Sequence, residues 1–329
     1  MFTEEIRRRI EDSYEVENNV LNAVPQPLVS IRTSTYNHGK YIRQCIEGIL
    51  MQKTSFPFEY IIGEDCSTDQ TREIVMEYAA KYPDIIRVVT ADYNVGMKAN
   101  GERCIMRCRG KYMALCEGDD YWIDPLKLQK QVDYLEAHPQ CSMSYTEAVI
   151  INEDPTKKVK RWRKGVTENF CEHLMIKGNP VVTASVLIRM NVYQEFMREQ
   201  STYDIQMKMG DVPLWIYAAK DHPVHHMDDK TVAYRVLANS ASHSPDPEKV
   251  RAFFQNSLDI KLYMNRRYNI GVSEKKMWRG FYKGVLQTMC GYSRKHMWEA
   301  VKEVAVKSPL AFFDLKVMFY LVKRCILNK

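Results

Sequence analysis

Short apolar runs alternate with amphipathic segments along the first 140 residues of the chain. Each run has the length of a strand, and each is followed by a segment whose apolar residues recur at helical spacing. The strand-like runs are 28–34, 58–63, 85–90 and 111–116, and the helical segments are 41–52, 71–82, 98–108 and 125–138. This alternation predicts a doubly wound, mostly parallel α/β sheet with helices on both faces.

The two ends of the chain depart from this alternation. Residues 1–24 predict a charged helix that stops before a Pro-Gln-Pro linker at 25–27, and the segment after Pro245 predicts a helical appendage rich in basic and aromatic residues. We therefore predict three parts: an N-terminal arm, 1–27; an α/β domain, 28–244, with a first half, 28–140, and a second half, 141–244; and a helical C-terminal region, 245–329.

Polar or acidic residues follow each of the four strand-like runs. In a doubly wound sheet, ligands bind beyond the carboxyl ends of the parallel strands. One such cluster would be an ordinary loop, but four on the same edge of a sheet predict a binding site. The clusters are 33–39, 64–69, 92–96 and 117–120.

The fourth cluster contains three carboxylates within four positions, at Glu117, Asp119 and Asp120. Carboxylates gathered at the end of a buried strand are costly unless a cation or ligand answers their charge. Their oxygen atoms suit a hard divalent ion, Mg²⁺ or Mn²⁺, which commonly holds phosphate. A turn before the helix that we expect at 125–138, with Asp124 as N-cap and Pro125 at its first position, explains the same acidic residues without a metal.

Glycine-rich phosphate-binding loops are absent from the sequence. No G-x-G-x-x-G follows the first strand-like run and no G-x-x-x-x-G-K-[ST] occurs, which disfavours a Rossmann site and a P-loop. A pyrophosphate would then need a metal held by Asp119 and Asp120. Asp65, from a neighbouring strand end, would accept a hydrogen bond from a nucleobase, and Tyr36 would stack on that base.

Composition narrows the cellular setting. The net charge of the 329 residues is +6, and the basic residues of the first two-thirds are dispersed, so we expect no nucleic-acid partner. Nine cysteines without a C-x-x-C pair indicate reduced thiols. With no signal-peptide pattern at the start and no run of about eighteen apolar residues, we expect a cytoplasmic protein without a spanning helix.

Taken together, the motifs at 28–37, 64–71, 94–96 and 110–122 resemble those of family 2 glycosyltransferases, and the run 117–131 is especially similar to a bacterial polysaccharide-type branch. The resemblance implies the GT-A fold and an inverting glycosyltransferase. Such an enzyme moves a sugar from a nucleoside diphosphate sugar, here with UDP as the expected nucleotide, to a hydroxyl of a glycan or lipid-linked glycan. It implies a divalent cation, Mn²⁺ or Mg²⁺, and a role in bacterial surface polysaccharide or glycan synthesis.

The resemblance also assigns roles to individual residues. Residues 28–140 become the nucleotide-sugar-binding half and 141–244 the acceptor half. Asp65 would contact the base, Asp119 the ribose or the metal, and Asp120 the metal and the diphosphate. Glu117 would complete the metal ligands, and Arg235 would neutralise diphosphate charge. The remaining residues assigned to nucleotide-sugar binding are Thr35, Tyr36, Asn37, Glu64 and Asn100.

Three positions depart from the family pattern. Glu117 stands where the D-x-D motif has its first Asp, although a carboxylate is kept. Ala99 replaces an arginine that usually precedes Asn100, which puts one diphosphate contact in doubt. Leu237 stands in the Tyr-Arg-x-His segment where a histidine is usual, so a histidine that would bind the metal or the diphosphate is lost at that point.

Inversion at the anomeric carbon requires a base that deprotonates the acceptor hydroxyl. The family carries an acidic turn before an apolar helix in its second half, and the matching residue here is Asp211. Asp211 also suits a plain helix N-cap, with Pro213 in the first turn. We favour the catalytic base and keep the cap as the alternative.

Two further segments leave alternatives open. His225 and His226, with Asp228 and Asp229, are compatible with zinc, but adjacent histidines point to opposite faces of a strand, so we favour a structural role. The segment 310–329 mixes bulky apolar and basic residues. It suits either an interfacial helix at the inner face of the plasma membrane or a helix packed on this domain or on a homodimer partner.

Three rival functions remain. A sugar nucleotidyltransferase would also use a doubly wound sheet and Mg²⁺, but residues 34–39 lack its glycine-rich basic loop. A catalytically inactive nucleotide-sugar or glycan-binding module would keep Asp65 and Asp120 without turnover. A membrane-associated scaffold is supported by the C-terminal segment alone.

Overall fold

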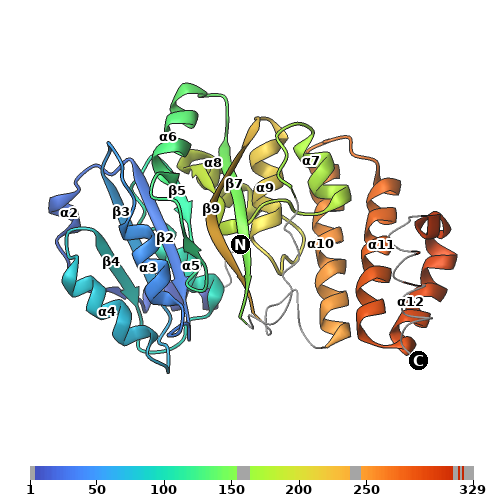
Figure 1. Ribbon diagram of the computed structural model, residues 1–329, viewed down its shortest axis with the longest axis horizontal. Helices are drawn as coiled ribbons and strands as arrows, with labels where there is room; N and C mark the ends of the chain where they lie inside the picture. The colour runs from blue at the N-terminus through green and yellow to red at the C-terminus, as the bar shows by residue number, and fades with distance from the viewer. Residues whose placement is uncertain (1–3, 154–163, 238–245, 314–317, 319–320, 322–329) are drawn as a thin grey trace. The chain divides into compact units, whose positions relative to one another are not determined.

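The computed structural model describes residues 4–153, 164–237, 246–313, 318 and 321 (Figure 1). The chain divides into two compact units, each built from several segments. The first unit comprises Met1–Glu168, Pro180–Tyr203 and Asp221–Val236, and the second comprises Asn169–Asn179, Asp204–Lys220 and Leu237–Lys329. The N-terminal residues therefore belong to the first unit, which contains the sheet.

Among the described residues, nine strands form one mixed sheet, in the order β1-β4-β3-β2-β5-β8-β7-β9-β6. The strands are β1 Tyr14–Glu15, β2 Val29–Thr35, β3 Phe58–Glu64, β4 Ile86–Thr90, β5 Tyr112–Leu115, β6 Tyr121–Trp122, β7 Met143–Asn152, β8 Leu187–Arg189 and β9 Val224–Val236. The four strands predicted from the first half of the domain, β4-β3-β2-β5, pair in parallel. In the part of the chain that the structure describes, β7 with β9 is the only parallel pair among those that involve the other strands.

Helices cover both faces of the parallel part, as predicted. They are α3 Ile42–Leu50, α4 Thr71–Lys81, α5 Met97–Ile105 and α6 Lys127–Ala137. Tyr60 and Ile62 belong to a core cluster that includes residues of α3, α4 and α6, whereas Ile61 packs with Cys104 of α5 on the other face. Burial on both faces explains why Tyr60–Ile62 of β3 and Tyr112–Leu115 of β5 are continuously apolar.

The single helix predicted over 1–24 is wrong. The structure has α1 Glu4–Glu11, then β1, then the short α2 Val20–Ala23. Strand β1 pairs antiparallel with β4, and Glu15 accepts hydrogen bonds from Nε and Nη2 of Arg87 at 2.8 and 2.9 Å. Edge pairing and this buried arginine outweigh the local helical tendency of the charged sequence.

The predicted cap of α6 is displaced. The helix begins at Lys127, with Leu126 in the cap position, so Asp124 and Pro125 precede it. Asp124 Oδ1 accepts the N–H of Leu126 at 2.9 Å, and Oδ2 pairs with Lys130 Nζ at 2.8 Å. Asp124 therefore closes the turn that leads into the helix, as Asp commonly does two residues before its partner N–H.

The second unit is helical, which confirms the predicted C-terminal helices. Its long helices are α10 Pro247–Arg267, α11 Glu274–Tyr292 and α12 Arg294–Lys307, and it also contains α7 Phe170–Glu172 and α9 Asp211–Lys220. Asp246 caps α10 by accepting the N–H of Glu248 at 2.9 Å. Most of the segment 310–329, which includes the predicted interfacial helix, lies outside the described residues.

Two general features bear on the setting of the protein. In the described parts of the chain, no helix is both long enough and apolar enough to cross a membrane. The eight cysteines in those parts are free thiols.

Gly48 lies inside α3 where the helix crosses β6, and it allows a close approach of two backbones. A Cβ there would lie 2.7 Å from the carbonyl oxygen and 2.9 Å from the nitrogen of Trp122. We expect Gly48→Ala to lower the free energy of unfolding by about 1–2 kcal/mol, because backbone atoms cannot yield as a side chain would. Urea unfolding measures this change. In the control Gly284→Ala, the added methyl meets open space in α11, so stability should hold or rise. Equal behaviour of the two variants would contradict the close approach.

Lys127 is fully buried and donates from Nζ to Gln131 Oε1 at 2.7 Å. Burial lowers its pKa from the ordinary 10.5 to about 7. Between these values the unfolded chain holds a proton that the folded chain has released, so rising pH favours folding. From pH 7 to pH 9 we expect Lys127 to add about 2 kcal/mol of stability. Urea unfolding should show a smaller gain in Lys127→Met than in wild type. The exposed Lys53→Met is the control, and equal pH dependence in all three proteins would refute this expectation.

Candidate functional site

The strand-end clusters predicted from the sequence meet at one edge of the first unit. Strands β2 and β3 end in register, with Thr35 opposite Glu64, and β5 lies on the other side of β2. The segment after β5 runs back along β2, because Cys116 N–H donates to Arg32 O and Gly118 N–H to Ser34 O, each at 3.1 Å. The carboxylates of residues 117–120 therefore lie beside the end of β2.

Gly118 determines how closely this carboxylate segment approaches β2. A Cβ there would lie 2.6 Å from Thr35 Oγ1 and 2.7 Å from His38 Nδ1. Thr35 is buried, and its Oγ1 lies 3.3 Å from that same His38 nitrogen. A side chain at position 118 would therefore push the carboxylates away from the predicted nucleoside residues.

The loop after β2 is held to the loop after β3. Asn37 adopts a left-handed backbone, with φ of 55°. Its Oδ1 accepts the N–H of Thr68 at 2.9 Å, and its own N–H donates to Ser67 Oγ at 3.0 Å. Tyr36, beside it, remains 42% exposed, so its ring offers surface for stacking.

Glu64 organises the end of β3. Its fully buried carboxylate accepts the N–H groups of Cys66 at 3.2 Å and Ser67 at 2.7 Å, and the hydroxyl of Thr90 at 3.2 Å. These bonds bind the loop after β3 to the end of β4. The described contacts of Glu64 thus fix a loop, and its assignment to nucleotide-sugar binding stays a prediction.

Asp65 holds the loop after β4. Its Oδ1 accepts the N–H of Val95 at 2.8 Å and its Oδ2 that of Gly96 at 3.0 Å. Burial raises the pKa of Asp65, and the two backbone donors and the Arg103 guanidinium at 3.6 Å oppose that rise. Each carboxylate oxygen has a second lone pair, so contact with a base is chemically compatible with this geometry and stays a prediction.

Asn100 lies beneath these loops. Its Nδ2 donates to Gly63 O at 2.9 Å, and its Oδ1 accepts from Arg103 Nε at 2.9 Å. The fully buried Arg103 also donates to Glu64 O at 2.8 Å and to Ser13 Oγ at 3.1 Å. Our sequence reasoning missed Arg103. Its spacing of three residues from Asn100 in a helix was the signal that the two share a face.

Arg235 comes to the carboxylate segment from the far end of β9. Its backbone N–H donates to Asp120 Oδ1 at 2.8 Å and its Nε to Asp119 O at 3.0 Å. Its guanidinium carbon lies 4.5 Å from the ring centroid of Tyr41 and 5.8 Å from that of Tyr121. The structure thus brings together the arginine and the two aspartates that the resemblance had placed in one site.

Burial disfavours the charged forms of two of these carboxylates. Asp120 is 4% exposed, and burial followed by the charge of Asp119 raises its pKa well above the ordinary value. Burial also raises the pKa of Glu117, against the opposing charge of Arg32 at 3.8 Å. A bound cation would restore the charged forms, so this oxygen-donor set fits Mg²⁺ or Mn²⁺.

The carboxylate oxygens of the three predicted metal ligands do not all lie close to one another. Among the described residues, Glu117, Asp119 and Asp120 do not form a group whose ligand oxygens all lie within 4.8 Å of one another. Their assignment as a metal site therefore stays a prediction. Arg32, which we did not predict, lies beside them on β2 and donates to Ser34 Oγ at 2.8 Å. A charged residue within the apolar run of β2 was the available signal.

Asp211 begins α9 and belongs to the second unit, where it is described by itself. Asn179 Nδ2 donates to its Oδ2 at 3.1 Å, and the N–H of Val212 also bonds to its carboxylate. Burial raises the pKa of Asp211, against backbone N–H hydrogen bonds and the charge of Lys261. A raised pKa suits a base. Asp211 also lies in the first turn of α9, where a carboxylate stabilises the N-terminus of a helix, so both roles stay open.

Comparison with known proteins adds sequence relatives. The profile of the family described as Glycosyl transferase family 2 matches residues 30–196. An uncharacterised protein of Mycobacterium tuberculosis (strain ATCC 25618 / H37Rv), Rv1520, is 35% identical over 222 residues, which cover 66% of this chain and 61% of that protein's length. A Bacillus subtilis (strain 168) protein named as a teichuronic acid biosynthesis glycosyltransferase, TuaG, is 30% identical over 223 residues, which cover 66% of this chain and 82% of TuaG.

Solved structures support the fold. S. aureus TarS 1–349, in complex with UDP-GlcNAc, superposes with a TM-score of 0.52 at 15% identity, over 90% of each chain. The mannosyltransferase PcManGT from Pyrobaculum calidifontis, in complex with GDP-Man and Mn²⁺, gives 0.51 at 14% identity, over 98% of this chain and 93% of that one. At such identities the likeness establishes the fold, and the expected GT-A architecture is confirmed. Because the family profile spans half of the sequence and TuaG is matched over most of its length, this chain belongs to glycosyl transferase family 2.

Proposed function

We propose that this protein is an inverting, metal-assisted glycosyltransferase that moves a sugar from a nucleoside diphosphate sugar to a hydroxyl acceptor. The observation that carries the proposal is the buried Asp120 beside Asp119 and Arg235, at the strand-end edge of a family 2 chain. UDP is the expected nucleotide. The expected acceptor is a glycan or lipid-linked glycan of bacterial surface polysaccharide synthesis.

Proteins similar to this chain support a nucleotide-sugar donor and a polysaccharide product. TarS is described with UDP-GlcNAc and the Pyrobaculum mannosyltransferase with GDP-Man and Mn²⁺. TuaG is named for teichuronic acid biosynthesis. We extend a nucleotide-sugar donor, a divalent cation and a polysaccharide product to this chain as proposals.

The donor's nucleoside would lie against the loops that Glu64 and Asp65 hold in place. Tyr36 would stack on the base from its exposed position, and Asp65 would accept the base N–H through a free lone pair. Asn37 and Asn100 would act by fixing these loops, since their side-chain bonds join neighbouring segments. Thr35 would face the carboxylate segment that follows β5.

The diphosphate would lie between the carboxylates and Arg235. Asp120, Asp119 and Glu117 would hold a divalent ion, which when bound supplies positive charge to the departing diphosphate. Arg235 supplies a second positive charge close to the same oxygens. Since Ala99 and Leu237 replace two expected diphosphate contacts, this chain would depend more strongly on Arg235.

Asp211 is the proposed base. Inversion requires one direct displacement, in which the acceptor oxygen forms its bond to the anomeric carbon as the bond to the diphosphate oxygen breaks. The hydroxyl proton passes to the Asp211 carboxylate. Burial favours the protonated form of this carboxyl, which strengthens it as a proton acceptor.

Asp120→Ala tests the metal and diphosphate assignment. With a panel of UDP-, GDP- and dTDP-sugars, we expect wild type to release one nucleoside diphosphate in Mn²⁺ or Mg²⁺ and none in EDTA. Asp120→Ala should release it at least about 100-fold more slowly, because charge stabilisation of the leaving group is lost. Asp133→Ala, an exposed acid on α6, is the matched control and should behave as wild type. Metal-dependent binding without release would instead indicate a binding module or a missing acceptor. Absence of binding to every donor would refute the proposal.

Asp211→Asn tests the base. We expect kcat to fall by about 10²–10⁴ with the donor KM nearly unchanged, because a general base acts in the transition state. In wild type the rate should rise with pH through the raised pKa of Asp211, since only the deprotonated carboxylate accepts the proton. Asp204→Asn, at an exposed site in the same unit, is the control. If Asp211→Asn loses stability but keeps kcat and its pH profile, Asp211 is a helix cap only.

A further inference from the structure

Three side chains of types that commonly bind metals lie together on β7 and β9, outside the candidate donor site. Residues His226 and Asp228 are two apart on β9 and therefore point to the same face of the sheet. Tyr145 of β7 is paired with His226, and paired residues share a face of the sheet. Glu147 is two residues after Tyr145, so it lies on the same face as His226. The register then shifts, with Glu147 opposite Lys230, and this bulge inserts extra residues into β9. Bulges of this kind re-aim side chains and often lie near functional sites.

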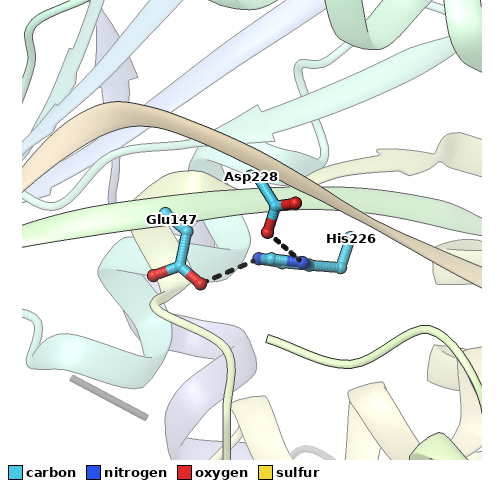
Figure 2. A group of neighbouring side chains, drawn as sticks. All are labelled: Glu147, His226 and Asp228. Atoms are coloured by element: carbon cyan, nitrogen blue, oxygen red, sulfur yellow. Dashed lines mark ion pairs between the residues drawn. The ribbon is translucent and has the colours of Figure 1, made fainter. Parts of the chain in front are cut away.

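The bulge brings three ligand atoms together (Figure 2). His226 Nε2 lies 3.2 Å from Glu147 Oε1, and Nδ1 lies 3.7 Å from Asp228 Oδ1. One ligand atom from each residue lies within 4.8 Å of the other two, and no other group of this kind occurs in the parts of the chain that the structure describes. Figure 2 shows the imidazole between the two carboxylates, with one of its nitrogens facing each.

The hydrogen bonding of the His226 imidazole gives a second reason to expect a ligand here, besides the grouping of the side chains. The His226 side chain is only 6% exposed, yet its Nε2 makes no hydrogen bond of acceptable geometry with any described residue. Its approach to Glu147 is therefore close without being well directed. A buried polar atom in this state is costly, and it calls for a ligand.

The residues next to the group are engaged elsewhere. His225 points to the other face, where its ring stacks on Tyr134 with centroids 3.5 Å apart. Asp229 pairs with Lys130 Nζ at 2.6 Å. As predicted, His225 and His226 point to opposite faces of the sheet. The third residue of the group, Glu147, comes from β7 and could not be found from the sequence of β9.

We propose that Glu147, His226 and Asp228 form a binding site for a divalent transition-metal ion, with Zn²⁺ as the preferred ion. One imidazole nitrogen and two carboxylate oxygens are ligands typical of zinc, with bonds of about 2.0–2.2 Å. Two such bonds at a tetrahedral angle separate their ligand atoms by roughly 3.3 Å, close to the 3.2 Å between Nε2 and Oε1. Hard Mg²⁺ and Ca²⁺ prefer oxygen alone. The proposal is independent of the glycosyltransferase assignment.

The exposure of the three side chains indicates how an ion would reach the site and in what order they would bind it. The Asp228 side chain is 83% exposed and Glu147 17%, so the site opens to solvent on the Asp228 side. A fourth position remains for water or for a group of a bound molecule. In the structure Asp228 faces Nδ1, whereas an ion between His226 and Glu147 is held by Nε2. Asp228 therefore binds the ion by turning away from Nδ1, which its exposure allows.

The ion would connect three segments of the first unit. Gly165 N–H donates to Glu147 Oε1 at 3.2 Å, and His226 N–H donates to Thr167 Oγ1 at 3.2 Å. A Cβ at Gly165 would lie 1.9 Å from His226 Cδ2, so the chain at 165 lies directly against the imidazole. A bound ion would therefore join β7, β9 and the segment 164–167.

The test is titration of the full chain, without a histidine tag and stripped with EDTA, with Zn²⁺ alone in a calorimeter. Asp120→Ala is used as the background, so that the predicted donor-site metal does not contribute. We expect one equivalent of Zn²⁺ to bind at this site. His226→Gln and Asp228→Ala should each weaken that binding by about 100-fold or more. His225→Gln is the control and should change it by less than about threefold, because His225 neither binds the ion nor hydrogen-bonds a residue that does.

Two further readouts keep the result unambiguous. Zn²⁺ should raise the Tm of the background protein and of His225→Gln, but not that of His226→Gln. Co²⁺ bound in the same place should give visible bands without a near-ultraviolet thiolate band, which excludes the cysteines as ligands. Because Asp228 is exposed, Asp228→Ala should fold even if His226→Gln does not. If Asp228→Ala and His226→Gln bind Zn²⁺ as the background does, or if no Zn²⁺ binds, the group is an ion pair only and the proposal is wrong.

Discussion

Two adjacent buried carboxylates at the end of β3, Glu64 and Asp65, hold the loops of the candidate site in one arrangement. Glu64 binds its own following loop and the hydroxyl of Thr90, while Asp65 binds the backbone at Val95 and Gly96. Burying two neighbouring carboxylates is costly, and here charge-assisted hydrogen bonds from backbone N–H groups offset that cost. These hydrogen bonds fix the loops after β3 and β4 relative to each other, and Asn37 joins the loop after β2 to the loop after β3.

The fold was predictable because the parallel strands are buried on both faces. That burial makes Tyr60, Ile61 and Ile62 of β3 apolar without interruption, and the segments between strands then show clear helical spacing. The polar clusters were predictable for the same reason: at the end of a buried strand, a polar residue needs a specific explanation. Asp65, Asp120 and Arg235 could therefore be chosen from motif order, and the structure places all three in the unit that contains the sheet.

What escaped prediction depends on partners that are distant in sequence. Glu15 forms an edge strand because Arg87, 72 residues away, binds its carboxylate. Arg103 is buried because three segments offer it acceptors, at Ser13, Glu64 and Asn100. The spacing of apolar residues within one segment does not predict contacts with segments that are distant in sequence. Metal-ligand spacing on β9 alone was likewise uninformative, because Glu147 lies on another strand.

The pairing of β1 with β4 has a consequence for solubility. Strand β4 would otherwise be the edge of the sheet, and its backbone N–H and C=O groups along Ile86–Thr90 would face solvent on one side. An open edge of apolar residues is a template for association between molecules. Tyr14 and Glu15 pair with Thr90 and Val89, and Val16 N–H donates to Val88 O at 2.9 Å, so this short segment covers part of that edge. Covering this edge reduces the backbone surface through which two molecules could pair, which is an effect on association and not on catalysis.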